Sequence, residues 1–230
     1  MHPRVGLLFS GGLDSSILAG HLLGLGHQVQ PLYVACQLAW EQAELPRARR
    51  FLSSLASPRL DELVVLQMPV GDLYGDHWST TGIGVPDAES PDEAVYLPGR
   101  NPLLVLKARM WCQLNGIGLL ALGCLRSNPF SDASEEFFRE FGTLLNDATD
   151  SVVEVVRPLA KLTKRQVMEL GRELPLEQTF SCIDPQDGLH CGRCNKCGER
   201  RQAFQLVEMD DPTTYATVLT ASTTQKVPGR

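Results

Sequence analysis

The 230-residue chain has no excess of positive charge, because 21 Lys and Arg stand against 27 Asp and Glu, a net charge of -6. Binding to a long nucleic acid depends on cations that neutralise phosphates, so we expect no stable nucleic-acid partner and favour small-molecule substrates. The chain also lacks an apolar run of the roughly 20 residues that a membrane helix needs. Its first apolar stretch is too short for a signal peptide, and we expect a cytoplasmic protein without membrane association.

Two common phosphate-binding motifs are absent, the Walker-type Gly-x-x-x-x-Gly-Lys-Ser/Thr and the Gly-x-Gly-x-x-Gly fingerprint. Instead, Ser-Gly-Gly-Leu-Asp-Ser-Ser at 10–16 follows the apolar run 4–9 and opens a predicted helix. The glycines can turn tightly and present N–H groups to an anion, and the helix N-terminus favours phosphate. The string therefore predicts a loop for the phosphates of ATP, with Asp14 orienting the loop or holding Mg²⁺. An ordinary strand–helix turn with Asp14 as the N-cap is the competing interpretation.

The rest of the chain alternates between strand and helix patterns. Strands are expected at 4–9, 29–34, 62–66, 119–123 and 152–156, with helices at 15–23, 41–54, 101–114, 135–145 and 163–173. This alternation predicts an α/β fold with a doubly wound, mostly parallel sheet and helices on both faces. We expect an ATP-binding domain at 1–178, a metal knuckle with a C-terminal helix at 179–210 and a tail at 211–230. Residues 71–98 are predicted to be a long loop, a candidate lid.

Four of the seven cysteines fall within sixteen residues, at spacings of x8, x2 and x2: Cys182, Cys191, Cys194 and Cys197. Four thiolates can close a tetrahedron around one structural Zn²⁺. Disulfides are less favoured, since no export signal accompanies the odd number of cysteines. An iron–sulfur cluster remains an alternative, although no further cysteine follows at x3. We expect His190 to be an exposed bystander, and the other three cysteines to be buried, inert thiols: Cys36, Cys112 and Cys124.

Taken together, these strings resemble the 7-cyano-7-deazaguanine synthases, a family of N-type ATP pyrophosphatases with a PP-loop. The resemblance rests on Phe-Ser-Gly-Gly-Leu-Asp-Ser-Ser at 9–16, Leu-Pro-Gly-Arg-Asn at 97–101, Arg-Pro-Leu at 157–159, Leu-Thr-Lys at 162–164 and the cysteine knuckle followed by Arg200. It implies an adenine nucleotide alpha hydrolase-like fold and a homodimer. It also implies a ligase of queuosine biosynthesis that adenylates 7-carboxy-7-deazaguanine and uses ammonia and a second ATP to form the nitrile.

The resemblance assigns the ATP site to eleven consecutive residues: Phe9, Ser10, Gly11, Gly12, Leu13, Asp14, Ser15, Ser16, Ile17, Leu18 and Ala19. Because adenylation builds negative charge on pyrophosphate, we expect Lys164 and Arg100 to stabilise it, acting with Ser10 and Asp14. The substrate residues are expected to be Gln37, Arg100, Asn101 and Asp132. The chain departs from the family pattern at 35–39 and at 126–134, the latter part of the deazapurine pocket. Alternatives are therefore an enzyme adenylating another acceptor, such as an amide-forming ligase or a tRNA-modifying enzyme, and a non-catalytic ATP-binding relative.

Overall fold

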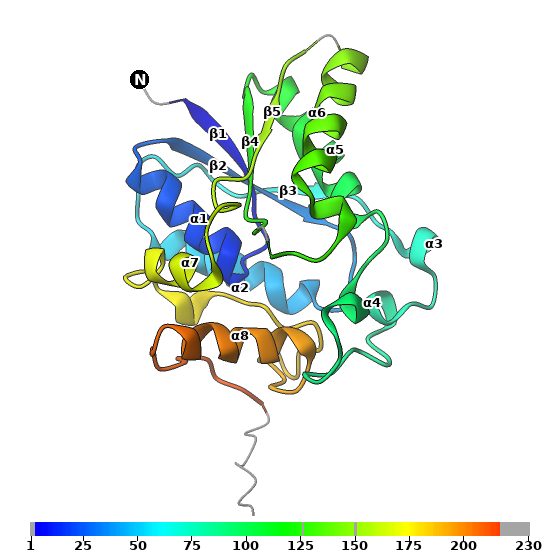
Figure 1. The fold of residues 1–230 in the computed structure, drawn as a ribbon, viewed down its shortest axis with the longest axis vertical. Coiled ribbons are helices and arrows are strands. Elements are labelled where there is room, and N and C mark those ends of the chain that lie inside the picture. The colour runs from blue at the N-terminus through cyan, green and yellow to red at the C-terminus, as the bar shows by residue number, and fades with distance from the viewer. Residues whose placement is uncertain (1–2, 126, 150, 217–230) are drawn as a thin grey trace, which may run out of the picture.

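A computed structural model of the chain describes residues 3–125, 127–149 and 151–216. Within these ranges, parallel strands form a five-stranded sheet in the order β3-β2-β1-β4-β5 (Figure 1). The strands are β1 (Arg4–Leu8), β2 (Gln28–Ala35), β3 (Val64–Gln67), β4 (Leu119–Leu122) and β5 (Glu154–Val156). All are paired in parallel, as expected for apolar runs covered on both faces.

Helices cover both faces of the sheet (Figure 1). One face carries α1 (Leu13–Gly24), α2 (Glu41–Ser54) and α7 (Lys164–Leu170), which share an apolar core with β1 and with α8 (Asn195–Leu206). The other carries α5 (Arg100–Leu114) and α6 (Glu135–Thr149), which pack on β2 and β4. The predicted doubly wound fold is therefore confirmed. Thr163 caps α7, because its hydroxyl accepts from the Gln166 N–H in a capping box.

The stretch 71–98 has more structure than the long loop predicted for it. It contains the short helices α3 (Gly71–Tyr74) and α4 (Trp78–Thr81) and the 3₁₀ turn η1 (Asp92–Val95). Its middle lies on the cysteine knuckle, where the Ala88 N–H donates to the Arg193 carbonyl at 2.8 Å. Two further 3₁₀ turns occur, η2 (Ser131–Ala133) and η3 (Leu176–Gln178).

The C-terminal segment also reaches the knuckle. The Ala216 N–H donates to the His190 carbonyl at 2.8 Å, so residues 211–216 of the expected tail lie against this part of the molecule. The remainder of that tail, 217–230, lies outside the described residues. Among the helices that the structure describes, none has the length and apolarity to cross a membrane.

Candidate functional site

A cavity of about 610 Å³ lies at the carboxyl ends of β1 and β4. Leu8 of β1 pairs with Leu122 of β4, so the two central strands end at the same level. The chain leaves β1 toward β2 and leaves β4 toward β5, in opposite directions along the sheet. This is the topological switch point, where an open α/β sheet binds its ligand.

The predicted phosphate loop forms one wall of this cavity. Gly11 has φ 81°, a conformation that favours glycine, and a Cβ there would lie 2.9 Å from the Ala48 Cβ. The Gly12 N–H donates to Ser10 Oγ at 3.3 Å, and the hydroxyls of Ser10 and Ser15 lie 3.2 Å apart. The loop thus gathers hydroxyl groups and the free amides of a helix N-terminus at the cavity edge.

The N-cap of α1 is Gly12, so the interpretation of Asp14 as an N-cap is wrong. Asp14 lies in the first turn and accepts a hydrogen bond from Lys164 Nζ at 2.6 Å. Both side chains are about one third exposed and line the cavity. A cation and the loop carboxylate are therefore held together beside the expected phosphate position.

Of the eleven residues expected at the ATP site, Gly11 forms the turn of the loop and the other ten divide into two groups. Six line the cavity: Phe9, Ser10, Gly12, Leu13, Asp14 and Ser15. Ser16, Ile17, Leu18 and Ala19 are buried in α1 beneath it. These four support the loop from within the core.

Arg100 and Asn101 begin α5 and line the large cavity opposite α1. They also line a smaller cavity of about 200 Å³ whose walls include aromatic side chains and Asp132. Asn101 Nδ2 donates to Asp132 Oδ1 at 3.1 Å, which joins two of the predicted substrate residues. Arg100 Nε is buried without a partner among the described residues. Of the segment 126–134, residue 126 lies outside the described part.

Gln37 lines neither cavity. It follows β2 with φ 63°, and its N–H donates to Glu41 Oε2 at 2.9 Å. The structure therefore places this predicted substrate residue in the turn that leads to α2.

The residues of the large cavity that were not predicted from the sequence include Glu44 of α2 and Tyr33 of β2. The buried Glu44 carboxylate accepts from the Tyr33 hydroxyl at 2.6 Å. Burial raises the pKa of Glu44 to about 7, against the opposing effects of Tyr33 and Arg100. One signal was available in the sequence, since Glu44 shares the core-facing side of its helix with Ala48 and Phe51.

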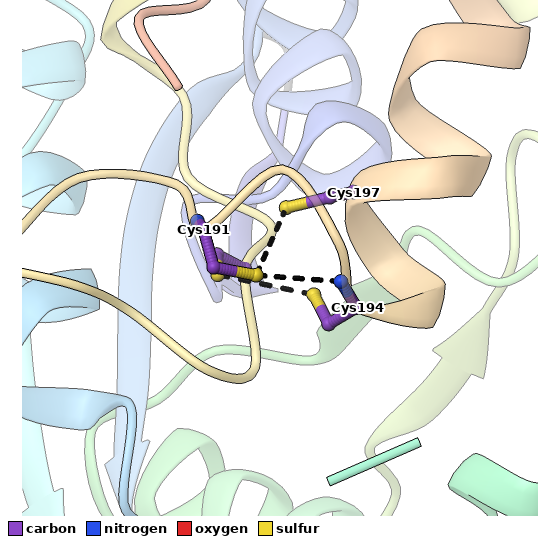
Figure 2. Close-up of side chains that lie close together, drawn as sticks. Cys191, Cys194 and Cys197 are labelled. Atoms are coloured by element: carbon purple, nitrogen blue, oxygen red, sulfur yellow. Dashed lines mark hydrogen bonds between the residues drawn. The ribbon is translucent and has the colours of Figure 1, made fainter. Parts of the chain in front are cut away.

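The four knuckle cysteines form a buried cluster with all sulfur atoms within 4.8 Å of one another. Figure 2 shows three of them, on the loop before α8 and in its first turn, with their sulfurs turned toward one another. The Sγ atoms of Cys182 and Cys194 lie 3.8 Å apart, and those of Cys191 and Cys197 lie 3.9 Å apart. A tetrahedron with metal–sulfur bonds of about 2.3 Å has edges of about 3.8 Å, so the cluster fits a four-coordinate metal site of the zinc type.

Backbone amides support this cluster. The Cys191 N–H donates to Cys182 Sγ at 3.2 Å, and the Cys194 N–H donates to Cys191 Sγ at 3.3 Å. Such bonds stabilise thiolates and orient metal ligands.

The expectation that His190 is exposed is wrong. It is 2% exposed, its ring packs against Phe180 and Tyr215, and Nε2 accepts from the Ser181 N–H. Its position between the Phe180 and Tyr215 rings explains this burial, and His190 is not part of the four-cysteine cluster. Cys36 and Cys112 are buried as expected, while Cys124 is half-buried at the cavity.

The knuckle and the phosphate loop are directly joined. Phe180 lies two residues before the first knuckle cysteine, and its N–H donates to the Gly11 carbonyl at 2.8 Å. Arg200 of α8 is buried and donates to Thr179 Oγ1 at 2.7 Å and to the Leu176 carbonyl at 2.9 Å. The cysteine cluster thus anchors the segment around Phe180, which is hydrogen-bonded to the phosphate loop.

Comparison with known proteins agrees with this arrangement. The sequence model of "Queuosine biosynthesis protein QueC" matches residues 4–208. This chain belongs to the QueC family. It is 31% identical to the 7-cyano-7-deazaguanine synthase of Solidesulfovibrio magneticus, with 91% of this chain and 94% of the relative covered. It is 30% identical to that of Methanothermobacter thermautotrophicus, with 90% and 97% covered.

A solved structure shares the fold of this QueC-family chain. The complex of a 4-thiouridine synthetase with RNA and bound ATP superposes with a TM-score of 0.50 at 15% identity, over 90% of this chain and 50% of the synthetase. At that identity the likeness shows the fold alone.

Proposed function

We propose that this QueC-family chain is an ATP-dependent carbon–nitrogen ligase that converts 7-carboxy-7-deazaguanine and ammonia to 7-cyano-7-deazaguanine in queuosine biosynthesis. The observation that carries the proposal is the phosphate loop, which opens with Lys164 and Arg100 onto one cavity of about 610 Å³. That volume suits a nucleotide together with part of an acceptor. The relatives of about 30% identity that span almost the whole chain are named for this activity.

Adenylation transfers AMP to the substrate carboxylate and releases pyrophosphate. The loop amides, the Ser10 hydroxyl and the N-terminus of α1 hold the leaving phosphates, and Lys164 neutralises the charge that develops on them. Asp14 is the residue that would hold Mg²⁺, which would supply further positive charge to the leaving phosphates. Asp14 also keeps Lys164 in place, at 2.6 Å.

The smaller cavity is the proposed site of the deazapurine ring. Its walls include Trp40, Tyr96 and Phe130, which offer flat apolar surfaces to an aromatic heterocycle. The Asp132 carboxylate and the Asn101 amide supply hydrogen-bonding groups for the edge of the ring. Arg100 lines both cavities and would face the carboxylate that is adenylated.

We assign the four-cysteine cluster to one structural Zn²⁺. Four thiolates leave no open coordination position for a substrate, and the 3.8 and 3.9 Å sulfur separations match a closed tetrahedron. The ion stabilises the knuckle and, through Phe180, the Gly11 turn. A homodimer remains a further expectation for this chain, which its mass in solution would test.

The direct test incubates the purified protein with ATP, Mg²⁺, ammonium and 7-carboxy-7-deazaguanine and measures AMP, pyrophosphate, amide and nitrile by mass spectrometry. We expect nitrile from the wild type and none from Asp14→Ala, while Asp147→Ala, an exposed carboxylate on α6, keeps its activity. AMP formation with another carboxylate or base, and none with this one, would favour a different acceptor. No AMP with any acceptor would favour an ATP-binding protein without turnover.

A further inference from the structure

The ammonia that the proposed ligase consumes is present at neutral pH almost entirely as ammonium, whose nitrogen has no free lone pair. An enzyme that uses it must bind a small cation through its N–H groups and take a proton from it. Cys124 at the cavity and Cys36 behind it have thiol pKa values raised to about 11 by burial. Neither thiol is therefore suited to act as the thiolate that would release ammonia from glutamine.

Two carboxylates of α2, Glu41 and Glu44, line the cavity, and their environments differ. Both oxygens of Glu41 are used within the fold, since Oε1 accepts from the Cys36 N–H at 2.8 Å and Oε2 from the Gln37 N–H at 2.9 Å. Glu41 therefore holds the turn after β2. Glu44 uses Oε2 for the Tyr33 hydroxyl, at 2.6 Å. Its Oε1 makes no hydrogen bond to another described residue and is not sealed from the cavity.

Three titratable groups act on the Glu44 carboxyl. Tyr33 from β2 and Arg100 from α5 favour its ionised form, whereas Glu41 on its own helix and burial oppose it. The balance leaves the pKa of Glu44 at about 7. A carboxylate in this range is charged in part of the population and can accept and release a proton near physiological pH.

We infer that Glu44, positioned by Tyr33, binds ammonium in the large cavity and removes a proton from it, which makes Glu44 a catalytic residue of amide formation. This inference rests on the proposed function. Glu44 takes one proton, and the freed lone pair of the nitrogen forms the C–N bond to the acyl carbon. The C–O bond to AMP breaks, AMP leaves with the bonding electrons, and one further proton passes from the nitrogen to solvent.

The test separates adenylation from amide formation in Glu44→Gln. Carboxylate-dependent ATP–pyrophosphate exchange without ammonium measures the first step, and kcat/KM for ammonium measures the second. We expect exchange within about threefold of the wild type and a fall of about 10²-fold or more in kcat/KM for ammonium. Hydroxylamine is largely unprotonated at neutral pH, so hydroxamate formation by Glu44→Gln should remain close to that of the wild type. Glu173→Gln, which removes an exposed carboxylate, is the matched control.

Tyr33→Phe gives a second measurement, whose result would not change if Glu44 had a purely structural role. Loss of the Tyr33 hydroxyl raises the pKa of Glu44, so the acidic limb of the pH profile of kcat/KM for ammonium should shift to higher pH. The inference is overturned if Glu44→Gln uses ammonium as well as the wild type, or if exchange and ammonium use fall together. If wild-type protein shows no carboxylate-dependent exchange, the proposed function itself fails, which is a different result from either of these.

Discussion

Lys164 Nζ lies 2.6 Å from Asp14 Oδ1, although the two residues are 150 positions apart in the chain. Lys164 is the first residue of α7 and Asp14 lies in the first turn of α1, so the contact joins two helices at the rim of the cavity. The adjacent loop is the proposed pyrophosphate site. The pair therefore places the lysine where negative charge develops during adenylation.

The first prediction concerns Lys164→Met. Removing a cation aimed at the leaving group should lower the rate of ATP–pyrophosphate exchange by about 10²-fold or more. The free energy of unfolding should change by only about 1 kcal/mol or less, because a partly exposed ion pair contributes little. Lys161→Met, an exposed lysine three residues earlier, is the control. Equal exchange rates in the two variants would contradict the role given to Lys164.

A second prediction concerns the turn of the phosphate loop. In Gly11→Ala the new Cβ would have a positive φ and would lie 2.9 Å from the Ala48 Cβ and 3.1 Å from its Cα. We expect a loss of about 2 to 4 kcal/mol in unfolding free energy, together with weaker ATP binding, because the loop must shift. A Cβ added at Gly24 would meet nothing within 4 Å, so Gly24→Ala should be neutral or stabilising by up to about 1 kcal/mol. Urea denaturation and calorimetric titration with ATP would measure both effects.

The parts of the site that depend on local sequence were predictable. The phosphate loop combines glycines and a helix N-terminus within seven residues. The metal site is indicated by the spacing of its four cysteines along the sequence. The strand and helix pattern follows from hydrophobic periodicity, so α2 was predicted with the bounds that it has, Glu41–Ser54. These features require no knowledge of distant contacts.

Features that depend on tertiary contacts were missed. His190 was expected to be exposed, since nothing local shows that Tyr215 would cover it. Glu44 carries no motif beyond its place on the core-facing side of α2, and its contact with Tyr33 of β2 appears only in the fold. Part of the stretch 71–98 lies on the knuckle, through the bond from the Ala88 N–H to the Arg193 carbonyl, which polar composition cannot reveal. In each case the decisive partner lies on another segment of the fold.

The third prediction is a pH dependence of stability that arises from Glu44. Its pKa is about 7 in the folded protein, above the ordinary value of 4.5. Between these two values the folded state keeps a proton that the unfolded state has lost, so stability falls as pH rises through the interval and levels off above pH 7. The loss is at most about 3 kcal/mol. Glu44→Gln should lack this slope, and unfolding free energies measured from pH 5 to pH 8 would show it. Parallel curves for the two proteins would contradict the raised pKa.

The fourth prediction concerns the metal and its connection to the ATP loop. We expect about one zinc and no iron per wild-type chain, and no bound metal in Cys197→Ala, whereas Cys112→Ala, which lies outside the cluster, keeps its zinc. Loss of the metal frees the segment whose Phe180 N–H holds the Gly11 carbonyl, so Cys197→Ala should bind ATP more weakly as well as unfold at lower temperature. Chelation of the wild type should produce the same pair of effects, and added zinc should reverse them. We would measure metal content, thermal unfolding and ATP affinity on the same samples. If the knuckle were independent of the loop, loss of the metal would lower stability and leave ATP affinity unchanged.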